Sequence, residues 1–478
     1  MATSYKTPGV HLEEIPKFPP SIAPVDTAIP AFIGYTERAV SRDGSDLTLV
    51  PKRIESLVEY EQHFGGPELE TKITVTIETT TTATAGAPVG VAATAAIDEQ
   101  TRSKHILYYA MQLFYANGGK SCYIVSVGPY LGSVGAELDG VDLGSGLEPL
   151  SMVDEPTLIV VPEAQSLTVA ADFGTLQNSC LAQCEDLKDR FVIMDVHGGL
   201  ESMSDPGADF LAAAAAFRST GPNDNLKYGA AYAPNLETTL DYQYDPTRVM
   251  VTEVLDTVAS PSVALDSLTS NQTSQRAKAA IRALPLTMPP SAAIAGIYAA
   301  VDAKRGVWKA PANVGLNAVV KPTIQYTNTT NDVLNVDVTA GKSINAIRPF
   351  VGKGTLVWGA RTLAGNDNEW RYVSVRRFFI FVEESTKKAT EQFTFEPNDA
   401  NTWVKVQAMI ENFLTTQWRA GALQGIKPEH AFYVAVGLGK TMTALDILEG
   451  RMVVEIGMAA VRPAEFLILR FSHKLAES

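Results

Sequence analysis

Short apolar runs that alternate with helical patterns dominate the first half of the chain. The runs are seven to nine residues long and end in Gly, Pro or polar residues, which is typical of strands buried on both faces. They are AFIGYTERA (31–39), CYIVSVG (122–128), TLIVVPE (157–163), FVIMDVHGG (191–199) and YGAAYAPN (228–235). Helical patterns lie between them at 103–116, 176–188 and 209–219. This alternation predicts an α/β region in which a mainly parallel sheet is covered by helices.

After Gly341 the pattern becomes typical of an α+β domain. Residues 351–363 and 370–385 favour strands, and Trp403–Ala420 is a strongly amphipathic helix. Further strand-like runs follow at 430–437, 451–461 and 466–471. The predicted fold class is therefore α/β plus α+β, in a multidomain chain with β-rich insertions and extended terminal strands.

Two segments interrupt the predicted pattern. Thr71–Ala96 is low in complexity, rich in Thr, Val and Ala, and nearly uncharged, so it is interpreted as an inserted hairpin or a mobile loop. Val319–Val338 alternates roughly between polar and apolar residues, with a turn predicted at Asn331-Asp332, and is interpreted as a second small β insertion. A surface segment without a core tolerates change, so we expect deletion of Thr71–Ala96 to leave an assembled protein.

The N-terminus has the pattern of an extended arm. Val10, Leu12 and Ile15 alternate with polar residues as in a short strand, and four prolines between positions 16 and 24 forbid helix and make a stiff connector. Such a strand pairs with its own domain or with the sheet edge of a neighbour. The predicted division is 1–24 (arm and proline linker), 25–300 (α/β domain, with the Thr-rich insertion at about 60–100), 301–345 (connector with the β insertion), 346–460 (α+β core domain) and 461–478 (C-terminal strand arm).

Composition and charge exclude several classes of function. The net charge is −14 and no Lys/Arg cluster occurs, which argues against a nucleic-acid-binding surface. The N-terminal residues lack the pattern of a signal peptide, and no run of about 18 apolar residues exists, so we expect synthesis in the cytoplasm and no membrane insertion. Cys122, Cys180 and Cys184 form neither a disulfide framework nor a metal-ligand set. No cofactor is expected.

Two enzymatic alternatives remain open at this point. Asp195 and His197 follow a predicted buried strand, where an open α/β sheet places ligands and catalytic groups, so His197 is a candidate base with Asp195 as its partner. No nucleophile elbow of the G-x-S-x-G kind accompanies them. Gly439-Lys440-Thr441 suggests a nucleotide-binding motor, but Val434 stands where a P-loop requires glycine, so a turn is the preferred interpretation.

Several long segments, in order along the chain, together resemble the sheath proteins of contractile phage tails and of related contractile injection systems. The start YKTPGVHLEEIP resembles the N-terminal arm of that family. The more specific segments are RGVWKAPAN (305–313), INAIRPFVGKGTLVWGARTL (344–363), WRYVSVRRFFIFVEES (370–385), FEPND (395–399), WRAGALQG (418–425) and GLGKTMTALDILEGRMVVEIGMAAVRPAEFLILRF (437–471). The Thr-rich segment and residues 319–338 depart from the pattern.

The resemblance implies a structural sheath subunit that catalyses nothing. Its implied partners are further copies stacked as six-fold rings, an inner tube protein, baseplate and terminator or cap proteins, and sheath paralogues, in a virion tail or a released extracellular particle. Contraction would drive the tube through a target envelope. The residues expected to pair between subunits are those of the two arms, namely Val10, His11, Leu12, Glu13, Glu14, Ile15, Phe466, Leu467, Ile468, Leu469, Arg470 and Phe471.

Overall fold

The chain divides into two compact units. A computed structural model describes residues 22–81, 88–98, 101–200, 208–466 and 468. The sheet domain comprises Asp26–Phe381 and the described residues from Arg462 onward, and the hairpin domain comprises residues 22–25 and Val382–Val461. Among the described residues, no helix has both the length and the apolar character needed to cross a membrane.

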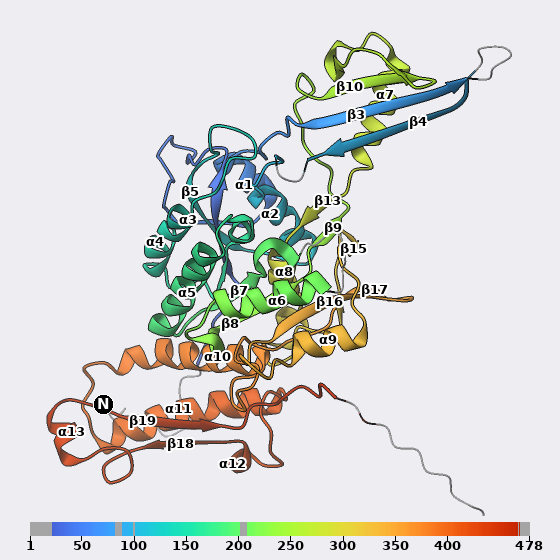
Figure 1. Ribbon diagram of the computed structural model, residues 1–478. Coiled ribbons are helices and arrows are strands. Elements are labelled where there is room, and N and C mark those ends of the chain that lie inside the picture. Colours follow the sequence, from blue (N-terminus) through green and yellow to red (C-terminus); the bar gives the residue numbers. More distant parts are fainter. Residues whose placement is uncertain (1–21, 82–87, 99–100, 201–207, 467, 469–478) are drawn as a thin grey trace, which may run out of the picture. The chain divides into compact units, whose positions relative to one another are not determined.

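The sheet domain is built on a nine-stranded sheet (Figure 1). In sheet order its strands are β14 (Val314–Gly315), β17 (Gly354–Val357), β16 (Ile344–Phe350), β8 (Gly229–Ala233), β7 (Phe191–Asp195), β6 (Leu158–Val160), β1 (Pro30–Thr36), β5 (Cys122–Pro129) and β2 (Lys52–Ile54). The strands from β16 to β5 are parallel, and antiparallel strands complete both edges. Strands β1, β7 and β8 are buried along their whole length, which confirms the predicted buried strands.

Helices connect the parallel strands. They are α1 (Leu57–Phe64), α2 (Leu107–Ala116), α3 (Gly140–Ser145), α4 (Leu147–Ser151), α5 (Ala170–Leu187), α6 (Ala208–Thr220) and α8 (Ser291–Arg305). The helical patterns predicted at 103–116, 176–188 and 209–219 correspond to α2, α5 and α6. A small sheet of β13 (Leu286–Met288), β9 (Leu236–Thr238) and β15 (Val319–Pro322) lies in the same domain.

The Thr-rich segment forms the predicted hairpin, but the expectation that it carries no core is wrong. Strand β3 (Ile73–Thr81) pairs on one side with β4 (Pro88–Ile97) and on the other with β10 (Met250–Leu255), which lies far away in the sequence. Ile73, Val75 and Ile77 are buried in the hydrophobic core. Strands β11 (Val258–Ala259) and β12 (Val263–Ala264) and helix α7 (Asn271–Arg282) complete this small appendage, at the upper end of the sheet domain in Figure 1.

Two further sequence predictions are wrong for identifiable reasons. Residues 370–385, predicted as a strand, lie largely in helix α10 (Val373–Thr390), whose side chains are buried on nearly every face, so no helical period of apolar and polar residues is visible. The turn predicted at Asn331-Asp332 lies inside helix α9 (Asn328–Asn335). Thr327 caps this helix by accepting a hydrogen bond from the Thr330 N–H at 3.2 Å.

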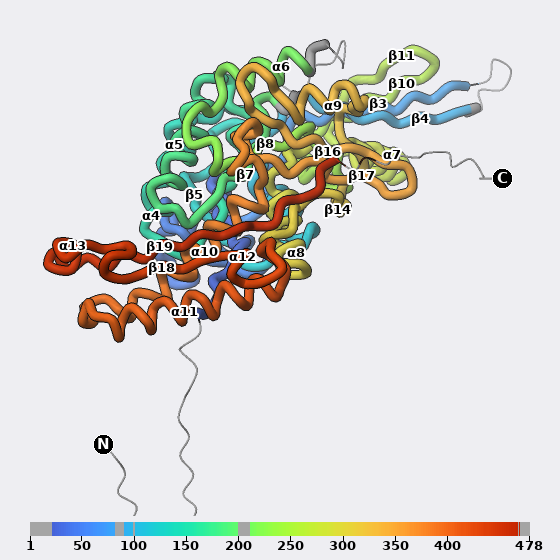
Figure 2. The backbone as a smooth tube through the Cα atoms, turned by 90° about the horizontal axis from the view of Figure 1, so that it is seen from below, coloured from blue at the N-terminus to red at the C-terminus, as the bar shows by residue number. Residues whose placement is uncertain are grey.

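The hairpin domain pairs β18 (Phe432–Val436) with β19 (Val454–Met458) against helix α11 (Ala400–Arg419), as Figure 2 shows. Asp399 caps α11 by accepting hydrogen bonds from the N–H groups of Asn401 and Thr402, both at 3.0 Å. The short helices α12 (Pro428–Ala431) and α13 (Ala444–Leu448) flank the strands. The units divide at Phe381/Val382 rather than at the predicted residue 346, because β16 and β17 belong to the nine-stranded sheet.

Candidate assembly site

The β18–β19 hairpin offers two open strand edges. It is a two-stranded sheet, and in the described residues no third strand pairs with either side. Val434 and Val436 are buried, while Tyr433 is exposed and donates from its hydroxyl group to Glu455 at 2.6 Å. Because a two-stranded sheet is marginal alone and an open edge presents a row of unpaired N–H and C=O groups, this hairpin is suited to accept further strands. Each edge is five residues long, and each predicted arm has six.

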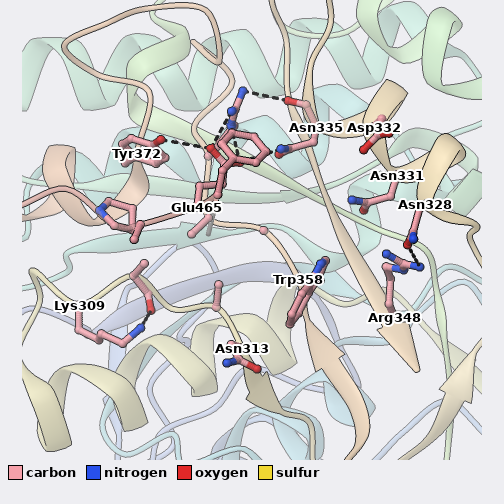
Figure 3. Close-up of a pocket in the computed structure, with 18 residues that line it drawn as sticks. Lys309, Asn313, Asn328, Asn331, Asp332, Asn335, Arg348, Trp358, Tyr372 and Glu465 are labelled. Atoms are coloured by element: carbon pink, nitrogen blue, oxygen red, sulfur yellow. Dashed lines mark hydrogen bonds and ion pairs between the residues drawn. The ribbon is translucent and has the colours of Figure 1, made fainter. Parts of the chain in front are cut away.

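The chain leading into the C-terminal arm is fixed at Glu465. Arg361 donates to the Glu465 carboxylate from Nε at 2.9 Å and from Nη2 at 2.7 Å, a bidentate geometry that adds strength and direction (Figure 3). Asn335 Nδ2 donates at 2.7 Å and the Tyr372 hydroxyl group at 3.1 Å. These four residues, here called the Glu465 anchor, fix the chain at the residue directly before Phe466.

The charge of the Glu465 carboxylate makes the anchor dependent on pH, because the anchor's ion pair requires the ionised form. Burial alone would raise the pKa of Glu465, but the hydrogen bonds and charge of Arg361, with Asn335, outweigh burial and hold the pKa below its ordinary value of 4.5. A carboxylate whose pKa is depressed by folding contributes stability that is fully present above its unfolded pKa and is lost as the pH falls through the folded pKa.

We therefore expect protease cleavage after Phe466 to be slow and independent of pH at pH values above 4.5. Cleavage should accelerate as the pH falls through the pKa of Glu465 in the folded protein, which lies below 4.5. The measurement is limited digestion with an acid-active protease over this range. Glu465→Gln is the matched control, since it should be cleaved at the faster rate throughout. An identical pH profile for both chains would contradict the role of this carboxylate.

The end of the N-terminal linker is fixed in a similar way. Arg377 and Asp302 form a buried ion pair, with Nη2–Oδ2 at 2.6 Å and Nη1–Oδ1 at 3.1 Å. Thr27 donates from its hydroxyl group to Asp302 at 2.6 Å and accepts from Arg377 through its carbonyl oxygen at 2.6 Å. We call these three residues the Thr27 anchor. Both Arg376 and Arg377 are buried, and Arg377 also lies 4.5 Å from the centre of the Tyr298 ring.

Asp195 and His197 do not form the predicted dyad. Asp195, at the end of β7, accepts a hydrogen bond from the Ser291 N–H at 2.8 Å and so binds the first turn of α8. Burial raises its pKa to about 7. His197 Nε2 lies 2.7 Å from the carbonyl oxygen of Leu167, and its ring packs against Phe173. Each residue thus binds its own structural partner, and the geometry gives no support to a base and its orienting acid.

Glu163 is another buried titratable group of the sheet domain. Its carboxylate accepts hydrogen bonds from the N–H groups of Tyr35, Ile106 and Leu107 at 2.9 to 3.3 Å. Burial raises its pKa to about 8, although the three N–H donors oppose this rise. Tyr35 belongs to β1, and Ile106 and Leu107 lie at the start of α2, so this carboxylate connects the strand to the helix. Across the described residues no group of three or more His, Cys, Asp or Glu side chains is placed to hold a metal ion.

The Gly439-Lys440-Thr441 triplet lies in a closed turn, as the sequence predicts. The N–H groups of Lys440, Thr441 and Met442 all donate to the carbonyl oxygen of Gly437, at 3.1 to 3.2 Å. The Gly439 N–H donates to the Met442 carbonyl oxygen at 2.9 Å. A P-loop needs such N–H groups free to point at phosphate, and here the turn itself satisfies them.

Lys440→Ala is accordingly expected to leave folding and assembly unchanged, because the Lys440 side chain makes no hydrogen bond or ion pair with the described residues. The measurement is tube formation by electron microscopy together with ATP binding by calorimetry. Tight ATP binding by the parent chain that disappears in the variant would contradict this interpretation.

Most of the predicted arm residues lie outside the described part of the chain. This holds for Val10, His11, Leu12, Glu13, Glu14 and Ile15 and for Leu467, Leu469, Arg470 and Phe471. Phe466 and Ile468 are described, exposed and in no strand, so their pairing stays a prediction. Sequence reasoning missed both anchors. Its one usable signal was the carboxylate of the PAEF segment, which is Glu465.

Comparisons with known proteins agree with this architecture. The phage tail sheath C-terminal domain family matches residues 365–474. A search of curated protein sequences found no match. Among solved structures, a chain of the PVC sheath complex in the contracted state, from an extracellular contractile injection system, is 28% identical, with 99% of each chain covered and a TM-score of 0.63.

Two structures of the anti-feeding prophage give similar values. A chain of its baseplate, six-fold symmetrised, is 29% identical over 99% of this chain and 100% of that chain, with a TM-score of 0.63. A chain of its helical sheath in the contracted state is 28% identical over 98% and 100%, with a TM-score of 0.61. These matches support the role of a sheath subunit in a contractile assembly. Residues 365–474 thus match the phage tail sheath C-terminal domain family, and the chain as a whole is similar to sheath subunits of contractile injection systems.

Proposed function

We propose that this chain polymerises as stacked six-fold rings around an inner tube and contracts to drive that tube through a target envelope. The observation that carries the proposal is the likeness over 99% of this chain to a sheath subunit in its contracted state. The sheath proteins it resembles are structural, which supports a role without catalysis. The baseplate structure of the anti-feeding prophage supports association with a baseplate. The tube and cap proteins are further proposed partners.

Strand addition at the β18–β19 hairpin provides the physical connection between subunits. We propose that an N-terminal arm and a C-terminal arm from neighbouring copies occupy the two open edges. Each backbone hydrogen bond contributes only about 0.5 to 1.5 kcal/mol net. A handful of bonds per arm, repeated in every copy, makes a connected mesh through effective concentration.

The mesh allows domains to rotate while connections persist. The anchors at Thr27 and Glu465 fix where each arm leaves the folded part of its own subunit, so a displacement of one subunit is transmitted to the next. The extended form would be a kinetically trapped state, and contraction would be downhill. The finished particle is proposed to be a virion tail or an extracellular particle.

Electron microscopy of the purified chain tests the proposal. We expect long hollow tubes or stacked rings with six-fold symmetry in cross-section. Dispersed particles of single-chain size, at concentrations where sheath subunits assemble, would contradict it.

A further inference from the structure

A polar groove lies beside the Glu465 anchor. Its volume is about 490 Å³, within the range of roughly 300 to 1,000 Å³ typical of ligand sites. Helix α9 and the residues around Trp358 line it, and the extended residues Pro463 to Phe466 form part of the lining. We call it the α9 groove. In Figure 3, Trp358 lies centrally, with Asn331 and Asp332 to one side and Lys309 to the other.

Several polar groups in the α9 groove have no partner within the described part of the chain. The side chains of Asn331 and Asp332 make no hydrogen bond or ion pair there, and neither does the indole N–H of Trp358. Trp358 is 40% exposed and packs on Phe350, with ring centres 4.4 Å apart. An asparagine amide both donates and accepts, as a peptide unit does, and an exposed indole adds apolar contact area. These features suit an extended peptide.

Charged side chains lie on both sides of the groove, Asp332 and Arg348 on one side and Lys309 on the other. Arg348 donates to the carbonyl oxygen of Tyr326 at 3.1 Å and to Asn328 Oδ1 at 3.0 Å. Asp332 supplies a carboxylate without a cation partner among the described residues, and Lys309 supplies an ammonium group on the other side. Partial burial, and then the neighbouring charge of Arg305, lower the pKa of Lys309. A bound carboxylate at this position would offset both effects. The groove therefore favours a segment with one cation and one anion.

We propose that the α9 groove binds the tail Ser472–Ser478 of a neighbouring copy, with Lys474 facing Asp332 and Glu477 facing Lys309. This inference rests on the proposed function, since assembly supplies the second copy. The tail follows the predicted arm strand directly and carries both required charges in SHKLAES. The other unassigned terminal segment, residues 1–9, contains Lys6 but no acidic side chain. The tail lies outside the described residues.

Crosslinking between two single-cysteine variants tests the proposal. Asn331→Cys and Ala476→Cys chains are mixed, assembled and treated with a short bis-maleimide. The native thiols give little background, because Cys122, Cys180 and Cys184 are buried and burial raises the pKa of Cys122 and Cys180 to about 12. We expect a covalent dimer that contains one chain of each kind. The matched control replaces Asn331→Cys by Val141→Cys on α3, which is exposed and outside the groove lining.

The outcomes separate this inference from the proposed function. Tubes without the mixed dimer would overturn the groove assignment and leave the sheath role intact, whereas a parent chain that forms no tubes would contradict the sheath role itself. In a chain carrying both cysteines, crosslinks confined to single chains would show that the tail binds its own subunit.

A charge exchange tests the same contact without introduced cysteines. Asp332→Lys should reduce the yield of tubes severalfold, and adding Lys474→Glu to that variant should restore the yield. Equal yields in all three chains would contradict the predicted contact.

Discussion

A chain that lacks Val10–Ile15 should fold and remain soluble but form no tubes. Every buried residue of the described part of the chain comes after this segment, so the expectation is that both cores form without it. It would leave one edge of each β18–β19 hairpin without the strand that we propose joins neighbours. Because helical assembly multiplies weak contacts over many copies, losing one contact per subunit is expected to abolish polymerisation rather than weaken it.

Sedimentation and electron microscopy of the deletion variant provide the measurement. The matched control keeps the arm and lengthens the proline linker between Pro16 and Pro24 by two or three residues. An extended chain spans at most about 3.3 to 3.6 Å per residue, so such an insertion adds roughly 7 to 11 Å of slack. This control should assemble in the extended form but fail to shorten when acid or denaturant triggers contraction. Normal contracting tubes from the arm-deleted chain would show that the arm pairs within its own subunit.

Asp302→Ala is expected to destabilise the sheet domain by about 3 to 5 kcal/mol, because it leaves the Arg377 guanidinium group buried without its counter-ion. Arg377 is 3% exposed, so water does not replace the lost carboxylate without local opening. The substitution also removes the acceptor of the Thr27 hydroxyl group. The measurement is the free energy of unfolding from urea titration.

Glu55→Ala is the matched control, since it breaks the ion pair with Arg53 at the surface. Exposed pairs contribute about 0 to 1 kcal/mol, so this variant should unfold almost as the parent does. If Asp302→Ala and Glu55→Ala lowered the free energy of unfolding equally, burial of the Arg377–Asp302 pair would have no special effect on stability. A second pair of variants, Arg377→Lys and Arg377→Met, separates loss of bidentate geometry from loss of charge.

Uniform burial made the centre of the sheet predictable from sequence. Strands such as β1 and β7 are short apolar runs between turn residues, and each such run had a single plausible interpretation. The same property hid α10, since a helix buried on nearly all faces has no polar side to reveal its period. Burial thus reveals short strands and conceals long helices.

Neither anchor was predictable, because its members lie far apart in the chain. Thr27 is 350 residues from Arg377, and Arg361 is 104 residues from Glu465. Periodicity reports on neighbours within a few positions, and ion pairs across such separations leave no local pattern. Asp195 was a candidate from the sequence, where its role stayed open. A carboxylate that binds the first turn of a helix and a carboxylate that orients a catalytic base both follow a buried strand, so the sequence does not distinguish them.

The appendage around β3 and β10 is built from two separate insertions of the chain, one that carries β3 and β4 and one that runs from β10 to α7. Glu70 and Gln243 to Asp245 pair at its root, with Glu70 N–H donating to Gln243 at 2.9 Å and Asp245 N–H donating to Glu70 at 3.0 Å. A genetic event that removed only one stretch would leave half a sheet with its apolar face uncovered. In the history of such proteins, the appendage would therefore be gained or lost only when both insertions change together. A sequence comparison that treats them as independent loops would count one module twice.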